Sequence, residues 1–567
     1  MFINSFGCIL IFIVSVLLAV PLGAYMKKVF SGDKSFLDFI KSLEKFIFKF
    51  CHINPLKEMN WKQYIIVLVI TNSVWLIYGF VMLMIQGNLF LNPANNLSMD
   101  WSMAINSAIS FITGTDLQHY SGEANTTYFS QLGVFMFLQF VCAATSLSAG
   151  VAVVRGLTAK TTASLGNFYN DFVLSLTRIL LPLCIITAIL FLCTGVPMTF
   201  QGPQHISSLQ GDSITVASGP VAAFLPIKEL GANGGGFFSA NDAHPFENPS
   251  FFSFIIHCII VLLLPMAFIF FMGHYLNAKK FARMIFTVMT LGLIIVTVPI
   301  ILEEVKGNPK ITNVGIDNNS NMEGKEVRYD AFYSGFYAGE NCSTAAGTMV
   351  GIHDSFMPMS GFFMLFGISV NAFFGGLGTG WINMFIFLII AVFIGGLMIG
   401  RTAELLGKKI DIKEIKITAA IVVLLALIPF ALTAIACFTY INYHGGNECL
   451  NWLSNKGPHG FTTILYEYIS ATSGNGSEFS GLENSTIFWN LTTCVAMLAG
   501  RFIPIVGTIW IAGLLSQKQY IPASFGTLKT NTTTFGLFLF SIIIILNILS
   551  LLPSLMLGPI AEHFLIK

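Results

Sequence analysis

The chain has 567 residues, of which 54% are hydrophobic and only 10% are charged, and its formal net charge is +1. A soluble domain carries roughly 25% charged residues. The positive mean hydropathy of +0.75 also argues against a soluble protein. The nearly neutral balance and the lack of a basic tract with interleaved aromatics argue against a nucleic-acid partner. We therefore expect an all-α integral membrane protein.

Apolar runs long enough to cross a bilayer, which takes about 20 residues, recur along the whole chain. The first run has no positively charged segment before it and exceeds a typical signal-peptide core, so we expect a retained span. If the long seventh run counts as one unit, there are ten candidate spans: 3–25, 61–86, 128–151, 171–195, 250–273, 284–303, 358–400, 417–442, 485–514 and 534–557.

Lysine and arginine gather in alternate connections between these spans. The connections 26–62, 274–283 and 401–416, together with those near 155–178 and 501–529, hold 22 of the 29 Lys and Arg residues. Because basic connections stay in the cytoplasm, we expect both termini on the outer side. Among the ten cysteines there is no CxxC pair, and a bridge between Cys342 and Cys449, which lie in polar segments, stays open.

Four polar, glycine-bearing segments interrupt the apolar pattern on the expected outer side. They are 111–123, 230–238, 343–349 and 470–477, and each follows a stretch too short to span: 100–112, 219–231, 328–343 and 460–472. Irregular backbone at membrane depth persists only where it is buried in protein or lines a wet cavity. A single such segment would be read as a surface turn, but four in the same position predict re-entrant loops.

The order of elements is therefore span, short helix, polar loop, span, repeated four times. The expected organisation is an N-terminal span with a basic cytoplasmic loop at 1–60, repeats at 61–151, 171–273, 284–400 and 417–514, and a C-terminal span at 534–557.

A cation fits this unit best. A short helix that points its C-terminus into the bilayer places its negative dipole end near the pathway, and glycine lets the following carbonyls turn inward. Rings of carbonyls replace the hydration shell of K⁺ or Na⁺. Acidic residues near the loops, with Asp116, Glu123 and Glu229 as the candidates for an outer acidic mouth, would concentrate cations.

The long seventh run is broken by glycines near its middle. We interpret it as one span whose flexible middle loop lies beneath the ion filter that the four re-entrant loops would form. This flexible loop would act as a gate. A fifth filter loop is the less suitable interpretation, because the break has no short helix of its own. The expected gate residues are Gly375, Gly376, Gly378, Thr379 and Gly380.

Arg401 and Arg501 follow or lie within late spans. Most residues of this kind are cytoplasmic anchors, and the alternative is a place at the inner end of the ion pathway. The chain has neither a GxxxxGK[ST] loop nor an aspartyl-phosphate motif, so ATP hydrolysis would need another chain.

At these residues the chain resembles the KdpA family, the potassium-translocating subunit of the bacterial Kdp P-type ATPase. The resemblance runs essentially end to end and is carried by GGGFFSANDAHPFENP at 234–249, GLMIGRT at 396–402, LGKKID at 406–411 and PHGF at 458–461. It implies a fold related to the potassium-channel and Trk-like superfamily, with four loops forming one K⁺ filter. Gly114, Asp116 and Gly474 stand where the family pattern usually has asparagine.

The resemblance also implies roles for residues and partners. K⁺ is the transported ion, with no organic cofactor in this chain. The expected partners are the P-type ATPase subunit KdpB and the small accessory subunits KdpC and KdpF, in a bacterial cell membrane. A stand-alone K⁺ channel or secondary cation transporter of related fold is the alternative. The implied filter residues are Thr113, Gly114, Thr115, Ala232, Asn233, Gly234, Ala346, Gly347, Gly474, Asn475 and Gly476.

Overall fold

The computed structural model describes residues 2–159, 161–207, 211, 213–313, 315, 320–442, 451–522 and 527–566, and most of them are helical. The described part contains ten helical segments long and apolar enough to cross a membrane, which confirms the expected all-α membrane class. These segments are Ile3–Ser31, Trp61–Asn88, Ser130–Thr158, Phe168–Cys193, Phe251–Tyr275, Lys279–Ile311, Thr379–Ile399, Ile412–Asn442, Ile487–Ser516 and Thr533–Ile566.

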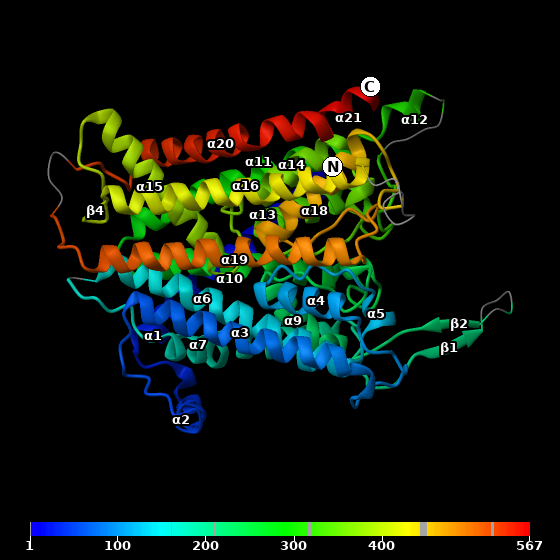
Figure 1. The fold of residues 1–567 in the computed structure, drawn as a ribbon, viewed down its shortest axis with the longest axis horizontal. Coiled ribbons are helices and arrows are strands. Elements are labelled where there is room, and N and C mark those ends of the chain that lie inside the picture. The colour runs from blue at the N-terminus through cyan, green and yellow to red at the C-terminus, as the bar shows by residue number, and fades with distance from the viewer. Residues whose placement is uncertain are drawn as a thin grey trace.

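The long helices lie side by side along the longest axis of the molecule, and both termini lie at the same end (Figure 1). An even number of crossings requires this arrangement. The helices are α1 (Phe2–Ser31), α3 (Trp61–Ile85), α6 (Phe137–Thr158), α7 (Phe168–Leu174), α8 (Leu181–Cys193), α10 (Phe251–Tyr275), α11 (Lys279–Lys306), α15 (Thr379–Ile399), α16 (Ile412–Asn442), α19 (Ile487–Ser516) and α20 (Thr533–Leu555).

Four helices too short to span lie between pairs of long ones, at the positions that the sequence indicated. They are α4 (Trp101–Thr113), α9 (Val221–Leu230), α13 (Asp330–Thr344) and α18 (Pro458–Ser473). Local chemistry explains where they start: the Asp100 side chain caps α4 by accepting from the Ser102 amide, and proline at the first turn suits the start of α18. Their surfaces are mostly buried among the long helices.

The seventh apolar run is two helices, α14 (Pro358–Val370) and α15, joined by an irregular segment. The break therefore begins before the expected 375–380, and Thr379 and Gly380 already belong to α15. Asn371 ends α14 with a left-handed φ of 40°, whereas the Gly380 amide donates to the Gly376 carbonyl and starts the next helix.

The remaining elements are short and lie at the two ends of the molecule. An antiparallel hairpin pairs β1 (Gln204–Ser207) with β2 (Ser213–Val216), with Gln204 opposite Val216, and a second pairs β3 (Glu404–Leu405) with β4 (Lys408–Lys409). The short helices are α2 (Lys41–Phe50), α5 (Gly122–Asn125), α12 (Pro309–Asn313) and α21 (Ala561–Ile566). Cys449 lies outside the described residues, and so does its expected bridge to Cys342.

Small residues let the helices approach one another closely, as is usual within membranes. Gly23 of α1 lies against the main chain of α10 near Ala267, and Gly339 of α13 lies against Thr297 of α11. A side chain at either glycine would overlap its neighbour. These contacts fix the short helix α13 and the span α1 against the long helices beside them.

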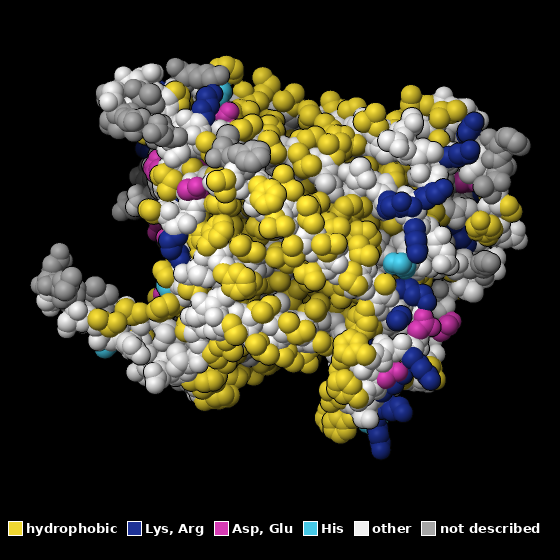
Figure 2. Space-filling view, turned by 180° about the vertical axis from the view of Figure 1, so that it is seen from behind, with side chains coloured by type: hydrophobic (Ala, Val, Ile, Leu, Met, Phe, Trp, Pro, Cys, Tyr) yellow, Lys and Arg dark blue, Asp and Glu magenta, His cyan; other side chains and the backbone are white. Residues whose placement is uncertain are grey.

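The surface divides by chemistry along the same axis. Figure 2 shows a broad hydrophobic band around the middle of the molecule, with most visible Lys and Arg side chains at one end. That end is opposite to the one where the termini lie in Figure 1.

Candidate ion filter and the cavity beneath it

The four short helices end at the four polar loops. Their C-terminal caps are Gly114, Gly231, Ala345 and Gly474, and each helix leaves its last carbonyls without partners inside the helix. The ends of these helices carry partial negative charge. Four such ends at one place favour a cation.

The backbone of the loops follows one pattern in all four repeats. A residue with left-handed φ is followed by one outside that region and then by a second left-handed residue. The pairs of left-handed residues are Gly114 and Asp116, Ala232 and Gly234, Ala345 and Gly347, and Gly474 and Gly476, with φ between 50° and 91°. Alternating backbone of this kind turns successive carbonyls toward one side of the chain, which is how a carbonyl-lined filter is built.

The loops meet as a closed ring. A Cβ atom at Gly234 would collide with the Ala346 carbonyl, one at Gly347 with the Asn475 carbonyl, and one at Gly476 with the Thr115 carbonyl. The second loop therefore touches the third, the third touches the fourth, and the fourth touches the first.

The first loop closes the ring against the second. An added Cβ on Gly235 would lie 2.8 Å from Cβ of Asp116, and one on Gly114 would lie 3.2 Å from Oδ1 of Asn233. Glycine is required at both positions for the close approach, and at Gly114 also for the left-handed backbone.

The structure thus brings the four loops that carry the implied filter residues into contact with one another. Thr113 is the last residue of α4 and its hydroxyl lies 3.0 Å from the Thr115 hydroxyl. Two further positions share the pattern, Ala345 and Asp116. The sequence analysis missed Ala345 because alanine carries no signal for left-handed backbone. Aligning Gly347 with Gly234 and Gly476 would have indicated it, because the first left-handed residue lies two positions earlier in each loop.

Hydrogen bonds to the loops hold this backbone. The Lys228 carbonyl accepts from the amides of Asn233 and Gly234 at 3.0 and 3.3 Å, and the Asn241 side chain donates to the Gly234 carbonyl at 2.8 Å. In the third and fourth loops, the Asn341 carbonyl accepts from the Ala346 amide and from the Asn475 side chain.

A small cavity of about 30 Å³ lies beneath the ring. All four helix caps line it, and so do Gly376, Leu377 and Thr379 from the segment between α14 and α15. A site of this size holds one or two water-sized occupants. The break in the seventh run therefore lies directly beneath the ring, and an added Cβ on Gly376 would be 3.9 Å from the carbonyls of Ala232 and Thr344.

The other glycines of the break have structural reasons for being glycine. Gly378 has a φ of 76° and packs on the main chain of α6 at Ser146. Gly380 lies against Gly375, and Gly375 lies against Asn371, so that the turn is tightly closed. Thr379 donates from its hydroxyl to the Gly376 carbonyl at 3.0 Å.

Arg501 lines the same cavity from the middle of α19. Its Nη2 donates to the Cys142 carbonyl at 3.3 Å and to the Ser146 hydroxyl. It therefore lies beside the ring of loops, and it is not a surface anchor. Arg401, in contrast, is exposed just after α15 and donates to the Thr527 carbonyl, away from the ring.

The three expected acids of the outer mouth lie in different surroundings. Glu123 is partly exposed and accepts from the Ser239 amide at 2.8 Å, and Asp116 is buried within the ring. Glu229 does not line an open mouth, because it is fully buried beside α10, where His257 Nδ1 lies 3.0 Å from its carboxylate.

Glu229, Asp242 and His257 come close enough together to suggest a metal site. The ammonium of Lys228, however, already lies 2.7 Å from a carboxylate oxygen of Asp242 and 2.7 Å from one of Glu247. A lysine in this place supplies the positive charge that a metal would bring. The cluster therefore fits a buried ion-pair network that supports the second loop.

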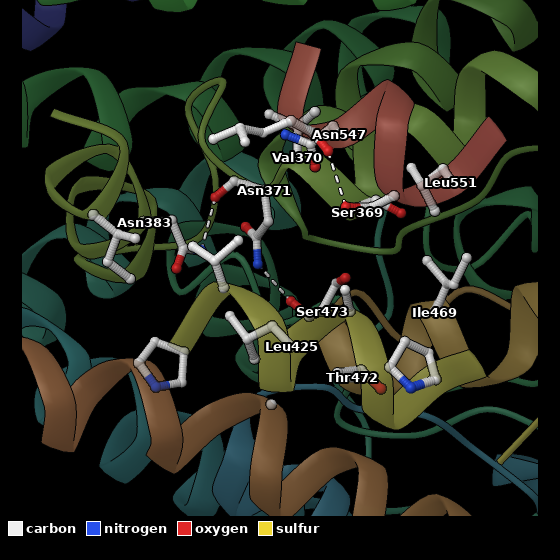
Figure 3. A pocket seen from close by; sticks show the side chains of 18 of the residues that line it. Ser369, Val370, Asn371, Asn383, Leu425, Ile469, Thr472, Ser473, Asn547 and Leu551 are labelled. Atoms are coloured by element: carbon white, nitrogen blue, oxygen red, sulfur yellow. Dashed lines mark hydrogen bonds between the residues drawn. The ribbon is translucent and has the colours of Figure 1, made fainter. Parts of the chain in front are cut away.

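A second cavity, of about 110 Å³, adjoins the first. The two share Asn371, Asn383, Ser473, Gly500 and Pro504. Figure 3 shows Asn371 between Asn383 and Ser473, and its side chain donates to the Ser473 carbonyl at 2.6 Å. The cavity extends sideways from the space beneath the ring toward α16 and α20, where Leu425 and Asn547 line it.

Comparison with known proteins identifies the relatives of this chain. The family model described as potassium-transporting ATPase A subunit, KdpA, matches residues 9–564. Proteins described as potassium-transporting ATPase potassium-binding subunit are 48% identical in Flavobacterium psychrophilum and 49% in Flavobacterium johnsoniae, over 99% of each chain. The one from Synechocystis is 42% identical over 98% of each chain.

Among solved structures, the potassium transporter TrkH from Vibrio parahaemolyticus matches with a TM-score of 0.53 and 16% identity. The match covers 88% of this chain and 97% of the TrkH chain, and it shows a common fold. The family model spans nearly the whole chain, and the relatives cover it from end to end. The chain therefore belongs to the KdpA family of potassium-transporting ATPase A subunits.

Proposed function

We propose that this chain, as the potassium-binding subunit of a Kdp ATPase, selects K⁺ from the outer face through the carbonyls of its four-loop ring. The observation that carries the proposal is the ring itself: four helix C-termini and four stretches of alternating backbone meet around one small cavity. Carbonyl oxygens and negative helix ends replace the water that K⁺ gives up.

The inner side of the ring supports a controlled exit. The segment between α14 and α15 and the guanidinium of Arg501 both line the cavity beneath it, so a cation that leaves the ring meets a narrow space and a positive charge. The adjoining cavity, with its asparagine side chains, offers a sideways route. We infer that K⁺ takes this route to a partner, the ATPase subunit KdpB, rather than entering the cytoplasm directly.

Orientation follows from charge. The Lys- and Arg-rich end of the molecule is opposite to the end with the two termini (Figures 1 and 2). The positive-inside rule therefore supports both termini outside a bacterial plasma membrane, with the ring open toward the outside. Small accessory subunits, KdpC and KdpF, would complete the complex.

The first test concerns the ring. Gly476→Ala places a methyl group on the Thr115 carbonyl and also strains a backbone with φ of 85°. We expect the apparent K⁺ affinity, measured by ATP-driven uptake into liposomes that contain the complete complex, to fall by about tenfold or more.

Gly457→Ala is the matched control, because Gly457 has a similar φ of 75° but no atom within 4 Å of the added methyl. This control separates backbone strain from damage to the ring. Equal loss of affinity in both variants would contradict the filter assignment. Uptake by the complete complex without ATP would instead favour the alternative, a stand-alone channel or secondary transporter.

A further inference from the structure

An apolar groove of about 480 Å³ runs between α1 and α11 on the outside of the helix bundle, with α13 at its floor. On α11 it extends from Thr290 to Leu302, which is about 18 Å at 1.5 Å per residue. Ile9, Ile294 and Leu302 line it, and each is half exposed or more. Lipid tails alone could cover such a surface, so the groove by itself indicates no ligand.

Two polar groups at its floor change this interpretation. Glu340 of α13 is 1% exposed and Thr297 of α11 is 6% exposed, and both line the groove. In the part of the chain that the structure describes, the two carboxylate oxygens of Glu340 have no hydrogen-bond partner, and the hydroxyl of Thr297 has none either. A buried polar group without a partner is costly, and more so in a membrane.

The chain satisfies its other buried acids more completely. Glu304 contacts the Lys325 ammonium at 2.8 Å and accepts from the Ser360 hydroxyl at 2.6 Å. Glu340 has the thiol of Cys258 beside it, and a thiol is only a weak donor. Among the described buried acidic residues, Glu340 is the one with both oxygens unpartnered.

The depth of Glu340 restricts what could supply the missing donor. It lies one turn before the third loop of the ring. In the orientation proposed above, on which this step rests, its helix enters the protein from the outer side. Lipid headgroups stay at the interface, outside the hydrocarbon core. A polar side chain on a membrane-spanning helix can reach this depth, and such side chains hydrogen-bond across helices.

We propose that the groove between α1 and α11 docks one transmembrane helix of a partner membrane protein. The docked helix presents a hydroxyl, amide or cationic side chain, which donates a hydrogen bond to Glu340. Its apolar side chains pack between α1 and α11. The surface is separate from the K⁺ ring, so its role is assembly and not ion selection.

The test uses the full chain in the membranes of cells that make the complete complex. The photo-crosslinking residue benzoylphenylalanine replaces Val298, which lines the groove and is 44% exposed. The control position is Ile189 on α8, which is 55% exposed and lies outside the groove. We expect Val298 to give an adduct with the transmembrane segment of one protein and Ile189 to give none with that protein.

The role of Glu340 is tested in the same assay. Interhelical hydrogen bonds in membranes contribute up to about 1.7 kcal/mol, so we expect Glu340→Leu to reduce the adduct by about threefold to twentyfold. Glu340→Gln keeps a carbonyl that accepts a hydrogen bond and should retain more adduct than Glu340→Leu. Replacing the donor on the partner by leucine should cause the same loss, with no further loss when both changes are combined.

Stability measurements show whether a loss of the adduct comes from a lost contact or from a misfolded variant. Removing an unpartnered acid should leave the thermal unfolding temperature of the purified chain unchanged or raise it, and K⁺ affinity should stay constant. If Glu340→Leu does not accumulate, Thr297→Val and Glu340→Gln give the same comparison. Lipid adducts alone at Val298, or a protein adduct that ignores both changes at the groove floor, would overturn the proposal.

Discussion

Asp116 is the residue that distinguishes the first loop from the other three. It has left-handed backbone where the other loops have Gly234, Gly347 and Gly476. Aspartate tolerates this conformation better than most residues. Its side chain is 2% exposed. One carboxylate oxygen accepts from Nε2 of the Gln139 side chain at 2.6 Å, and the other has no partner among the described residues.

An ionised carboxyl at the ring attracts the cation that the ring binds, and a bound cation in turn favours the ionised form of Asp116. We predict that Asp116→Asn, which keeps the shape and removes the charge, weakens apparent K⁺ affinity by about threefold to tenfold, as expected for a nearby charge at intermediate dielectric. Concentration-dependent uptake into liposomes measures it. Glu483→Gln, at an exposed position, is the control. Unchanged affinity in Asp116→Asn would mean that this carboxyl carries no charge that K⁺ senses.

At the scale of single residues, the sequence indicated which residue types the loops contain, but not which neighbours surround each side chain. The loop glycines were identified because glycine lets the following backbone turn its carbonyls inward. The close contacts between the loops were not predicted. Ala345 was not recognised as left-handed, since alanine does not signal that conformation, and Asp116 was considered only for its charge. Glu229 was expected in an open mouth, because nothing in a linear sequence indicates that Lys228, Asp242 and His257 would fold around it.

Among the elements, the segment between α14 and α15 has the clearest functional test. The suitable position is Gly376, because an added methyl would lie 2.9 Å from Thr379 Oγ1 and face the cavity without left-handed strain. Gly378 is a poorer choice, since any side chain there overlaps the α6 main chain. We predict that Gly376→Ala slows ATP-driven K⁺ transport severalfold and leaves the apparent K⁺ affinity unchanged.

The control for Gly376→Ala is Gly361→Ala on α14, where the nearest atom to the new methyl is 3.8 Å away. Transport rate and half-saturating K⁺ concentration, measured in the same liposome preparation, separate a gate from a binding site. A wild-type rate in Gly376→Ala would remove the basis for a gate, and equal slowing in both variants would indicate a packing defect.

Element boundaries could be predicted where the length of an apolar run decides them. Long apolar runs gave the ten spans, and the short helices appear where the sequence had stretches too short to cross. The break in the seventh run was placed at its glycines, but it begins at Asn371. A sequence pattern does not indicate that a single asparagine will end the helix early, because this depends on its hydrogen bond to Ser473 in another repeat.

At the scale of the whole molecule, a histidine joins three distant parts of the chain. His459 Nε2 lies 3.0 Å from Asp354 of the segment after the third loop, and Nδ1 lies 2.8 Å from Glu562 of α21. Burial disfavours the charged imidazole, but the hydrogen bonds with Asp354 and Glu562 outweigh it and raise the pKa of His459 to about 10. The sequence offered no reason to bring these residues together.

This raised pKa predicts how the attachment of the C-terminal helix depends on pH. Because the folded pKa exceeds the ordinary value of 6.5, the stabilisation is complete below pH 6.5 and is lost as pH rises toward 10. We predict that His459→Gln lowers the unfolding temperature of the detergent-solubilised protein by about 1 to 3 °C at pH 6 and has almost no effect at pH 10. The exposed His205→Gln is the control. A difference that stays constant across this range would show that the imidazolium does not hold α21 in place.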